Sequence, residues 1–194
     1  AQVKGQSQLI SPGAKAVFAY DPSTGKEIWT IRYGNHSSAA RTLVGHDMAF
    51  INTGYGKAEL LGIRVDGKGD ATDTHIVWRL RKGAPNKPSP VLHNGHLYTV
   101  TDGGVASCIH PKTGDVIWQA RIGGEYSASL LLSKGNIYCF DQGGTCLVFQ
   151  ANPKEFKQVS KSELDDGFMS SPAVFLNSLI LRTKTHLYRI QKKG

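Results

Sequence analysis

Two histidines, His93 and His96, stand three residues apart in the sequence. On a helix this spacing would bring both imidazoles to one face, where they could bind a metal ion. Between them lies Asn94-Gly95, a dipeptide that adopts the positive φ angles of a tight hairpin turn at low cost. The sequence therefore favours a surface hairpin over a metal site.

The adjacent carboxylates Asp165 and Asp166 are the next candidates for chemistry, as a pair for acid–base work. Adjacent side chains in a strand or loop point apart, so they do not form a ready-made pair. The sequence contains neither a Gly-x-Ser-x-Gly nucleophile turn nor a phosphate-binding loop. We predict no catalytic residue and no metal site.

Cys139 and Cys146 flank a predicted turn. If Gln142 and Gly143 form a two-residue turn, the two cysteines lie opposite each other, within reach of a disulfide. The alternative is two small buried thiols, since cross-strand disulfides are strained. Cys108 is expected in a similar core position, and three cysteines are too few for a disulfide framework.

The chain has 194 residues and a formal net charge of +8, which favours an anionic partner such as nucleic acid, a membrane surface or an acidic glycan. Its 23 Lys and Arg are spread along the whole chain. No basic helix, zinc knuckle or aromatic ribonucleoprotein motif accompanies them, so we expect no nucleic-acid partner. No run of 18 apolar residues occurs, which excludes a transmembrane helix.

Two segments of the chain resemble each other, YDPSTGKEIW at Tyr20–Trp29 and IHPKTGDVIW at Ile109–Trp118. A divergent copy begins at Val65 and ends at Trp78 after a short insertion, and a weakly similar copy covers residues 150–156. Self-similarity with a period of about forty residues indicates a repeat architecture.

The clearest repeat unit predicts strands over 89–93, 96–101, 105–109 and 115–120, with no helical period among them. Four antiparallel strands at this period form a β-propeller blade. We predict an all-β propeller of four to five blades in one domain. The expected blades cover residues 8–32, 38–82, 88–121, 127–160 and 170–191.

The first and last predicted blades are each one strand short, while the other three are complete. The two ends do not complement each other, so we interpret the chain as the C-terminal half of a seven- or eight-bladed propeller. Two copies related by a twofold axis would complete a ring, which makes a homodimer an expected partner.

Large flat side chains recur at the end of the fourth strand, where they can fill the gap between blades. The predicted structural wedges are Trp29, Trp78 and Trp118.

The pattern Asp-x-x-Thr-Gly-Lys-x-x-Trp resembles the tryptophan-docking repeat of the pyrroloquinoline-quinone (PQQ) dehydrogenase-like propellers, and the resemblance covers essentially the whole chain. Segments 170–173 and 181–188 are most similar to a set of bacterial PQQ-like repeat proteins, whose full-length members are longer and exported. The resemblance implies a β-propeller fold.

For function, the resemblance implies two branches besides these bacterial PQQ-like repeat proteins, which have no settled role. Quinoprotein dehydrogenases hold PQQ with an adjacent Cys-Cys disulfide, a Trp floor, a Ca²⁺ ion and a catalytic Asp. This sequence has no Cys-Cys pair, its three Trp all occupy the repeat position, and no position matches the catalytic Asp motif. The other branch includes a cofactor-free assembly lipoprotein of the outer membrane. We therefore predict no cofactor and no enzyme, with a PQQ-dependent dehydrogenase whose cradle is incomplete as the alternative.

The loops that differ between repeat units are the candidate binding surface. The links from each fourth strand to the next blade carry non-repeating residues at equivalent positions, and a mixed polar and aromatic rim suits a small polar ligand or a peptide. The alternative is that loops simply vary more than strands. The predicted rim residues are Asn35, His36, Asn86, Lys87, Glu125, Tyr126, Asp166 and Phe168.

These observations predict a non-enzymatic binding or assembly scaffold of the bacterial cell envelope. We expect an exported, periplasmic or envelope-associated protein whose signal is not in this sequence. Its partner would be a protein or a small polar ligand at the rim. A third possibility is a basic binder of anions or glycans.

Overall fold

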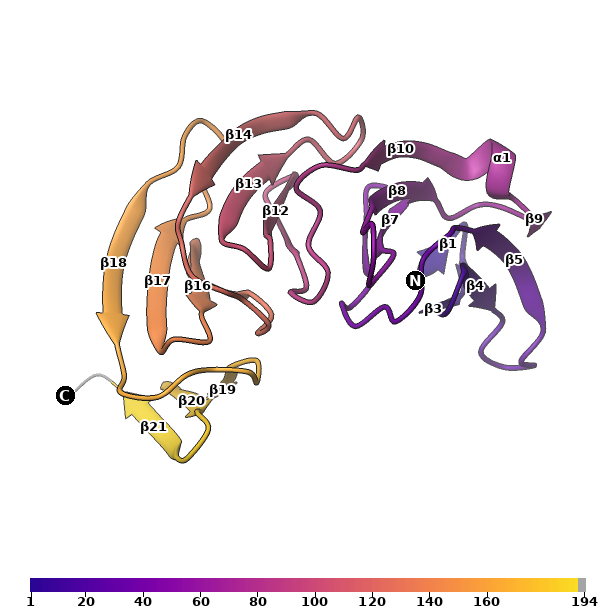
Figure 1. The fold of residues 1–194 in the computed structure, drawn as a ribbon. Helices are drawn as coiled ribbons and strands as arrows, with labels where there is room; N and C mark the ends of the chain where they lie inside the picture. Colours follow the sequence, from indigo (N-terminus) through magenta and orange to yellow (C-terminus); the bar gives the residue numbers. More distant parts are fainter. Residues whose placement is uncertain (192–194) are drawn as a thin grey trace.

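The computed structural model describes residues 1–191, which form five blades that follow one another along an arc (Figure 1). Blade 1 contains β3 (Leu9–Pro12), β4 (Ala16–Tyr20) and β5 (Glu27–Arg32). Blade 2 contains β6 (Leu43–Gly45), β7 (Met48–Asn52), β8 (Leu60–Arg64) and β10 (Ile76–Leu80). Blade 3 contains β11 (Val91–His93), β12 (His96–Val100), β13 (Val105–Ile109) and β14 (Val116–Arg121).

Blade 4 contains β15 (Leu131–Ser133), β16 (Asn136–Phe140), β17 (Thr145–Gln150) and β18 (Gln158–Glu163). Blade 5 contains β19 (Ala173–Phe175), β20 (Ser178–Arg182) and β21 (Leu187–Gln191). Consecutive strands within each blade pair antiparallel, and β5, β10, β14 and β18 lie on the outer side of the arc. The predicted all-β architecture of four-stranded antiparallel units is confirmed.

The hairpin at Asn94-Gly95 forms as predicted, because both residues have positive φ angles, 45° and 72°. His93 pairs with His96 directly across this turn.

The sheet of blade 1 contains four strands, whereas the sequence predicted three. The insertion in the second repeat forms β9 (Gly69–Asp70), which pairs parallel with β5, and then the short helix α1 (Thr72–His75). The backbone N–H of Ala71 donates to Thr30 O at 2.9 Å, and the N–H of Arg32 donates to Thr72 Oγ1 at 2.9 Å. The insertion therefore covers the outer edge of blade 1 instead of looping into solvent.

A hairpin of β1 (Gln2–Val3) and β2 (Gln6–Ser7) precedes blade 1, and Val3 packs into the core between blades 1 and 2. The helical structure in residues 1–191 contains nothing long and apolar enough to span a bilayer.

The predicted register of the two cysteines in blade 4 is wrong by one residue. Cys139 pairs with Leu147, and Phe140 pairs with Cys146. The turn between the strands contains three residues instead of two, because Asp141 N donates to Thr145 O. Since a shift of one residue moves a side chain to the other face of the sheet, Cys139 and Cys146 enter different cores.

All three cysteines are free thiols. Burial raises the pKa of Cys108 and of Cys146 to about 11, and raises that of Cys139 as well. The thiolate, which is the reactive form, is therefore scarce near neutral pH.

Candidate functional site

Each of the three tryptophans links one blade to the next. The indole Nε1 of Trp29 donates to Val65 O at 3.1 Å, that of Trp78 to Pro111 O at 2.8 Å, and that of Trp118 to Asn152 O at 2.9 Å. All three accepting carbonyls follow the third strand of the next blade. The indoles thus lie within the junctions between blades, where they pack and bond to scaffold.

Small residues beside the indoles allow this close approach. A Cβ added to Gly62, which pairs with Trp78 in the sheet, would lie 2.1 Å from the indole ring. In the next blade, a Cβ added to Gly114 would lie 2.7 Å from the same ring, and Gly114 has a φ of +78°. Gly114 therefore serves both turn conformation and the packing of Trp78, whereas Gly62 serves the packing alone.

Blade 4 departs from this pattern. Ser160 pairs with Val148, just as Trp118 pairs with Cys108 in blade 3, so serine occupies the tryptophan position. The junction between blades 4 and 5 consequently has no indole of its own.

The linkers between blades are hydrogen-bonded to the blades on both sides. The N–H of Tyr126 donates to Asp102 O at 2.8 Å in blade 3, and Gln142 N of blade 4 donates to Glu125 O at 2.8 Å. We name the surface made by the linkers and the turns between second and third strands the linker face. The linkers are residues 33–42, 81–90, 122–130 and 164–172, and the turns are residues 53–59, 101–104, 141–144 and 183–186.

A row of serines reinforces the start of successive inner strands. Arg41 N donates to Ser89 Oγ at 2.9 Å, Ser89 N to Ser129 Oγ at 3.3 Å, and Ser129 N to Ser171 Oγ at 2.9 Å. The hydroxyl of Ser129 also donates to Ser89 Oγ at 2.9 Å. Blades 3, 4 and 5 thus each receive a backbone hydrogen bond from the blade before.

Two of the predicted rim residues lie in the core. Tyr126 and Phe168 are each 1% exposed. The Phe168 ring packs edge-on against Phe140 at 5.2 Å between ring centroids, and burial raises the pKa of Tyr126. At these two linker positions the side chain serves as packing between blades.

The other predicted rim residues lie on the linker face. His36, Lys87 and Glu125 are exposed, and Lys87 Nζ lies 3.4 Å from Asp102 Oδ1. Asn35, Asn86 and Asp166 are partly buried, and local hydrogen bonds hold them in place. The structure thus brings six of the eight to one face, spread over four junctions.

Two exposed apolar side chains on this face were not predicted from the sequence. Tyr55 is 69% exposed and meets the His36 ring edge-on at 6.1 Å, while Met169 is 57% exposed. Tyr55 lies between Gly54 and Gly56, a setting typical of a loop. These flanking glycines are the sequence feature from which the exposure of Tyr55 could have been predicted.

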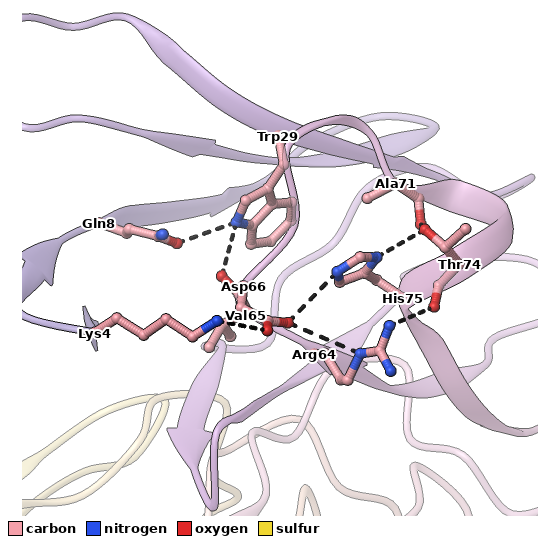
Figure 2. A network of polar contacts seen from close by, with 9 residues as sticks. All are labelled: Lys4, Gln8, Trp29, Arg64, Val65, Asp66, Ala71, Thr74 and His75. Carbon is pink, nitrogen blue, oxygen red and sulfur yellow. Dashed lines mark hydrogen bonds and ion pairs between the residues drawn. The ribbon is translucent and has the colours of Figure 1, made fainter.

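The opposite face is made by the turns between first and second strands and by those between third and fourth strands, and we name it the turn face. A polar cluster lies on this face. Figure 2 shows Asp66 between Lys4, Arg64 and His75. Its carboxylate accepts a hydrogen bond from Lys4 Nζ at 3.2 Å, and lies 3.8 Å from Arg64 Nε and 3.4 Å from His75 Nε2. Above all the bond from Lys4 holds the pKa of Asp66 below its ordinary value. This network fastens the N-terminal hairpin and the insertion to blade 2.

The quinone cradle of the resembling dehydrogenases does not fit residues 1–191. The three indoles are committed to backbone carbonyls in the junctions, and Cys108, Cys139 and Cys146 are separate thiols. Over the same residues, His, Cys, Asp and Glu form no group of three or more that could hold a metal ion.

Comparisons with known proteins agree with this geometry. Residues 65–155 match the PQQ-repeat family model described as outer membrane protein assembly factor BamB. No curated protein matches the sequence.

Among solved structures, BamB from Moraxella catarrhalis matches with a TM-score of 0.70 and 15% identity over 93% of this chain and 57% of that one. The computationally designed Ika8 protein matches with a TM-score of 0.69 and 11% identity, over 94% and 54%. The β-propeller domain of Cps50 (Swd1) from Myceliophteria thermophila matches with a TM-score of 0.65 and 14% identity, over 95% and 66%.

The chain thus spans less than two thirds of the length of each of these structures. The blades and the matches to propeller structures show an all-β fold of the propeller type, in which residues 65–155 resemble the PQQ repeats of the matched family model.

Proposed function

We propose that the chain is a non-enzymatic scaffold of the cell envelope, which binds a partner protein through the linker face. The observation that carries this proposal is the contrast between two sets of residues. The tryptophans of blades 1 to 3, the serine row from blade 2 to blade 5 and the linker backbone recur along the chain and are engaged within the scaffold. The exposed side chains of the linker face do not repeat.

These exposed side chains are chemically varied. The first junction presents His36 and Tyr55 as an aromatic pair, the next presents Lys87, and the later ones present Glu125 and Met169. A surface that mixes aromatic, apolar and charged groups on a rigid backbone suits a protein partner. The likeness to an outer membrane assembly factor supports a location in the cell envelope.

Site-specific photo-crosslinking tests this proposal. A photoreactive amino acid replaces Tyr55, Glu125 or Met169 on the linker face, and Lys26 or Lys154 on the turn face as matched exposed controls. We expect one partner band in envelope extracts from the linker-face positions and none from the controls. Equal labelling from both faces, or labelling from the controls alone, would overturn the proposal.

Two further measurements address the alternatives and the oligomeric state. A saturable change in PQQ absorbance on adding the protein would favour the quinoprotein alternative, and a steep fall of partner binding with salt would favour the anion or glycan binder. We also propose that two copies complete a ring, which native mass spectrometry tests: a dimer supports it and a monomer removes it.

A further inference from the structure

The junction between blades 4 and 5 contains a cleft of about 1010 Å³ on the turn face. Tyr138 of blade 4 forms one wall, and Val174, Leu179 and Ile190 of blade 5 form the other. Val174 and Ile190 are 55% and 42% exposed, so the cleft leaves apolar surface in water.

The junction between blades 3 and 4 shows what normally fills this place. There the Trp118 ring lies between the blades, with centroids 6.2 Å from Tyr98 and 6.2 Å from Phe149. By strand register, Tyr138 of the cleft is the counterpart of Tyr98, and Ile190 is the counterpart of Phe149. The walls of an indole site are therefore present in the cleft.

The indole itself is absent from this junction. The counterpart of Trp118 is Ser160, which is not among the residues that line the cleft. All three tryptophans of the chain are bonded within other junctions. A second copy of residues 1–191 would therefore bring no spare tryptophan, so we take the occupant to be a segment of another polypeptide.

The charges around the cleft define the occupant further. Lys134 and Arg189 line it, and its lining contains no acidic side chain. Neither cation forms an ion pair with the acidic residues among 1–191. Such a site favours a carboxylate next to the apolar group.

We propose that the cleft binds a tryptophan side chain of an acidic peptide segment from a partner protein. The indole inserts between Tyr138 and Ile190 as Trp118 does between Tyr98 and Phe149, and acidic neighbours of the tryptophan meet Lys134 and Arg189. This site lies on the turn face and is independent of the linker-face scaffold proposed above.

Titration of a fluorescently labelled peptide Asp-Asp-Val-Ile-Trp-Gln-Ala, whose core copies residues 115–120 of blade 3, tests the proposal on the whole chain. We expect saturable binding, weakened at least about tenfold when Ala replaces the peptide's Trp. No saturation below about 1 mM, or equal binding of the Ala peptide, would overturn the proposal.

Three variants of the protein locate the site. Ser160→Trp supplies the indole from the chain itself, so it should raise Tm and abolish peptide binding. The double variant Lys134→Glu, Arg189→Glu should weaken binding about tenfold and remove its salt dependence. Lys154→Glu makes a matched charge change on an exposed lysine outside the cleft and should leave binding unchanged. Undiminished binding to a folded Ser160→Trp protein, shown by its circular dichroism, would place the peptide elsewhere and overturn the proposal.

Discussion

The junction between blades 1 and 2 and the junction between blades 4 and 5 differ in how they are closed. At the first, Trp29 is fully buried and donates two hydrogen bonds, and β9 covers the outer edge of the blade. At the second, Ser160 replaces the indole and β18 is exposed along its whole length. The comparison teaches that the repeat sets the backbone, while one side chain at each junction decides how tightly two blades pack.

The largest expected effect comes from Trp29→Ala. Truncating a fully buried aromatic side chain costs about 3–5 kcal/mol of the free energy of unfolding, because apolar contacts are lost and a cavity remains. Urea unfolding followed by circular dichroism measures the loss. The matched control is Ser160→Ala, expected within about 0.5 kcal/mol of the unmodified chain because this serine is exposed. Similar losses in both variants would contradict the comparison.

A smaller effect is expected from Gly62→Ala, which tests packing in the junction between blades 2 and 3. The added methyl group would overlap the Trp78 ring, and overpacking of this kind costs about 1–3 kcal/mol. Gly103→Ala is the control, since no atom outside the adjoining residues lies within 4 Å of its added Cβ. If both glycine variants unfold at the same urea concentration, Trp78 does not pack over Gly62.

Ser129→Ala should cost about 1 kcal/mol, the usual contribution of a hydrogen bond to stability. The hydroxyl both accepts from Ser89 N and donates to Ser89 Oγ, so the two serines are coupled. A double-mutant cycle with Ser89→Ala measures this coupling from the unfolding free energies. If the losses in unfolding free energy of the two single variants add up to the loss of the double variant, the two serines do not stabilise each other.

The smallest effect concerns pH and the network around Asp66. The folded pKa of Asp66 lies below its ordinary value near 3.8, chiefly through the bond from Lys4. The contribution of this carboxylate to stability is therefore complete above the ordinary value and is lost as the pH falls through the folded pKa. The carboxylate is 40% exposed, so the contribution is modest.

The variant Asp66→Asn lacks this titration. Its Tm should lie slightly below that of the unmodified chain at about pH 6, and the difference should close below the folded pKa of Asp66. Melting curves at low salt over this range measure the difference. A gap in Tm that stays constant down to low pH would show that the charge of Asp66 does not stabilise the fold.

The strands of blade 3 could be predicted closely from sequence, because tight turns punctuate an alternating pattern. Asn94-Gly95 fixed the position of its first hairpin. The insertion in the second repeat could not be predicted as β9, since its pairing with β5 is a contact between blades that no local pattern encodes. The cysteine register failed on turn length, because Asp141 closes a three-residue turn where two residues were expected.

The candidate site was predictable as a surface but not residue by residue. Position in the repeat located the linkers, yet the same position is exposed at His36 and buried at Phe168. The aromatic type of Tyr126 and Phe168 was interpreted as a binding signal, whereas both rings fill space between blades. The cleft between blades 4 and 5 depends on Ser160 in place of tryptophan, which becomes meaningful only with the strand register known.

The serine row also bears on how such a chain can grow. Ser89 and Ser129 stand at equivalent points of neighbouring blades, and each receives a backbone bond from the blade before it. A tandem duplication of the gene segment between these points would copy a blade together with both of its contact surfaces. The new blade would meet partners that it already fits, so the number of blades can change in a single genetic event without a new interface having to evolve.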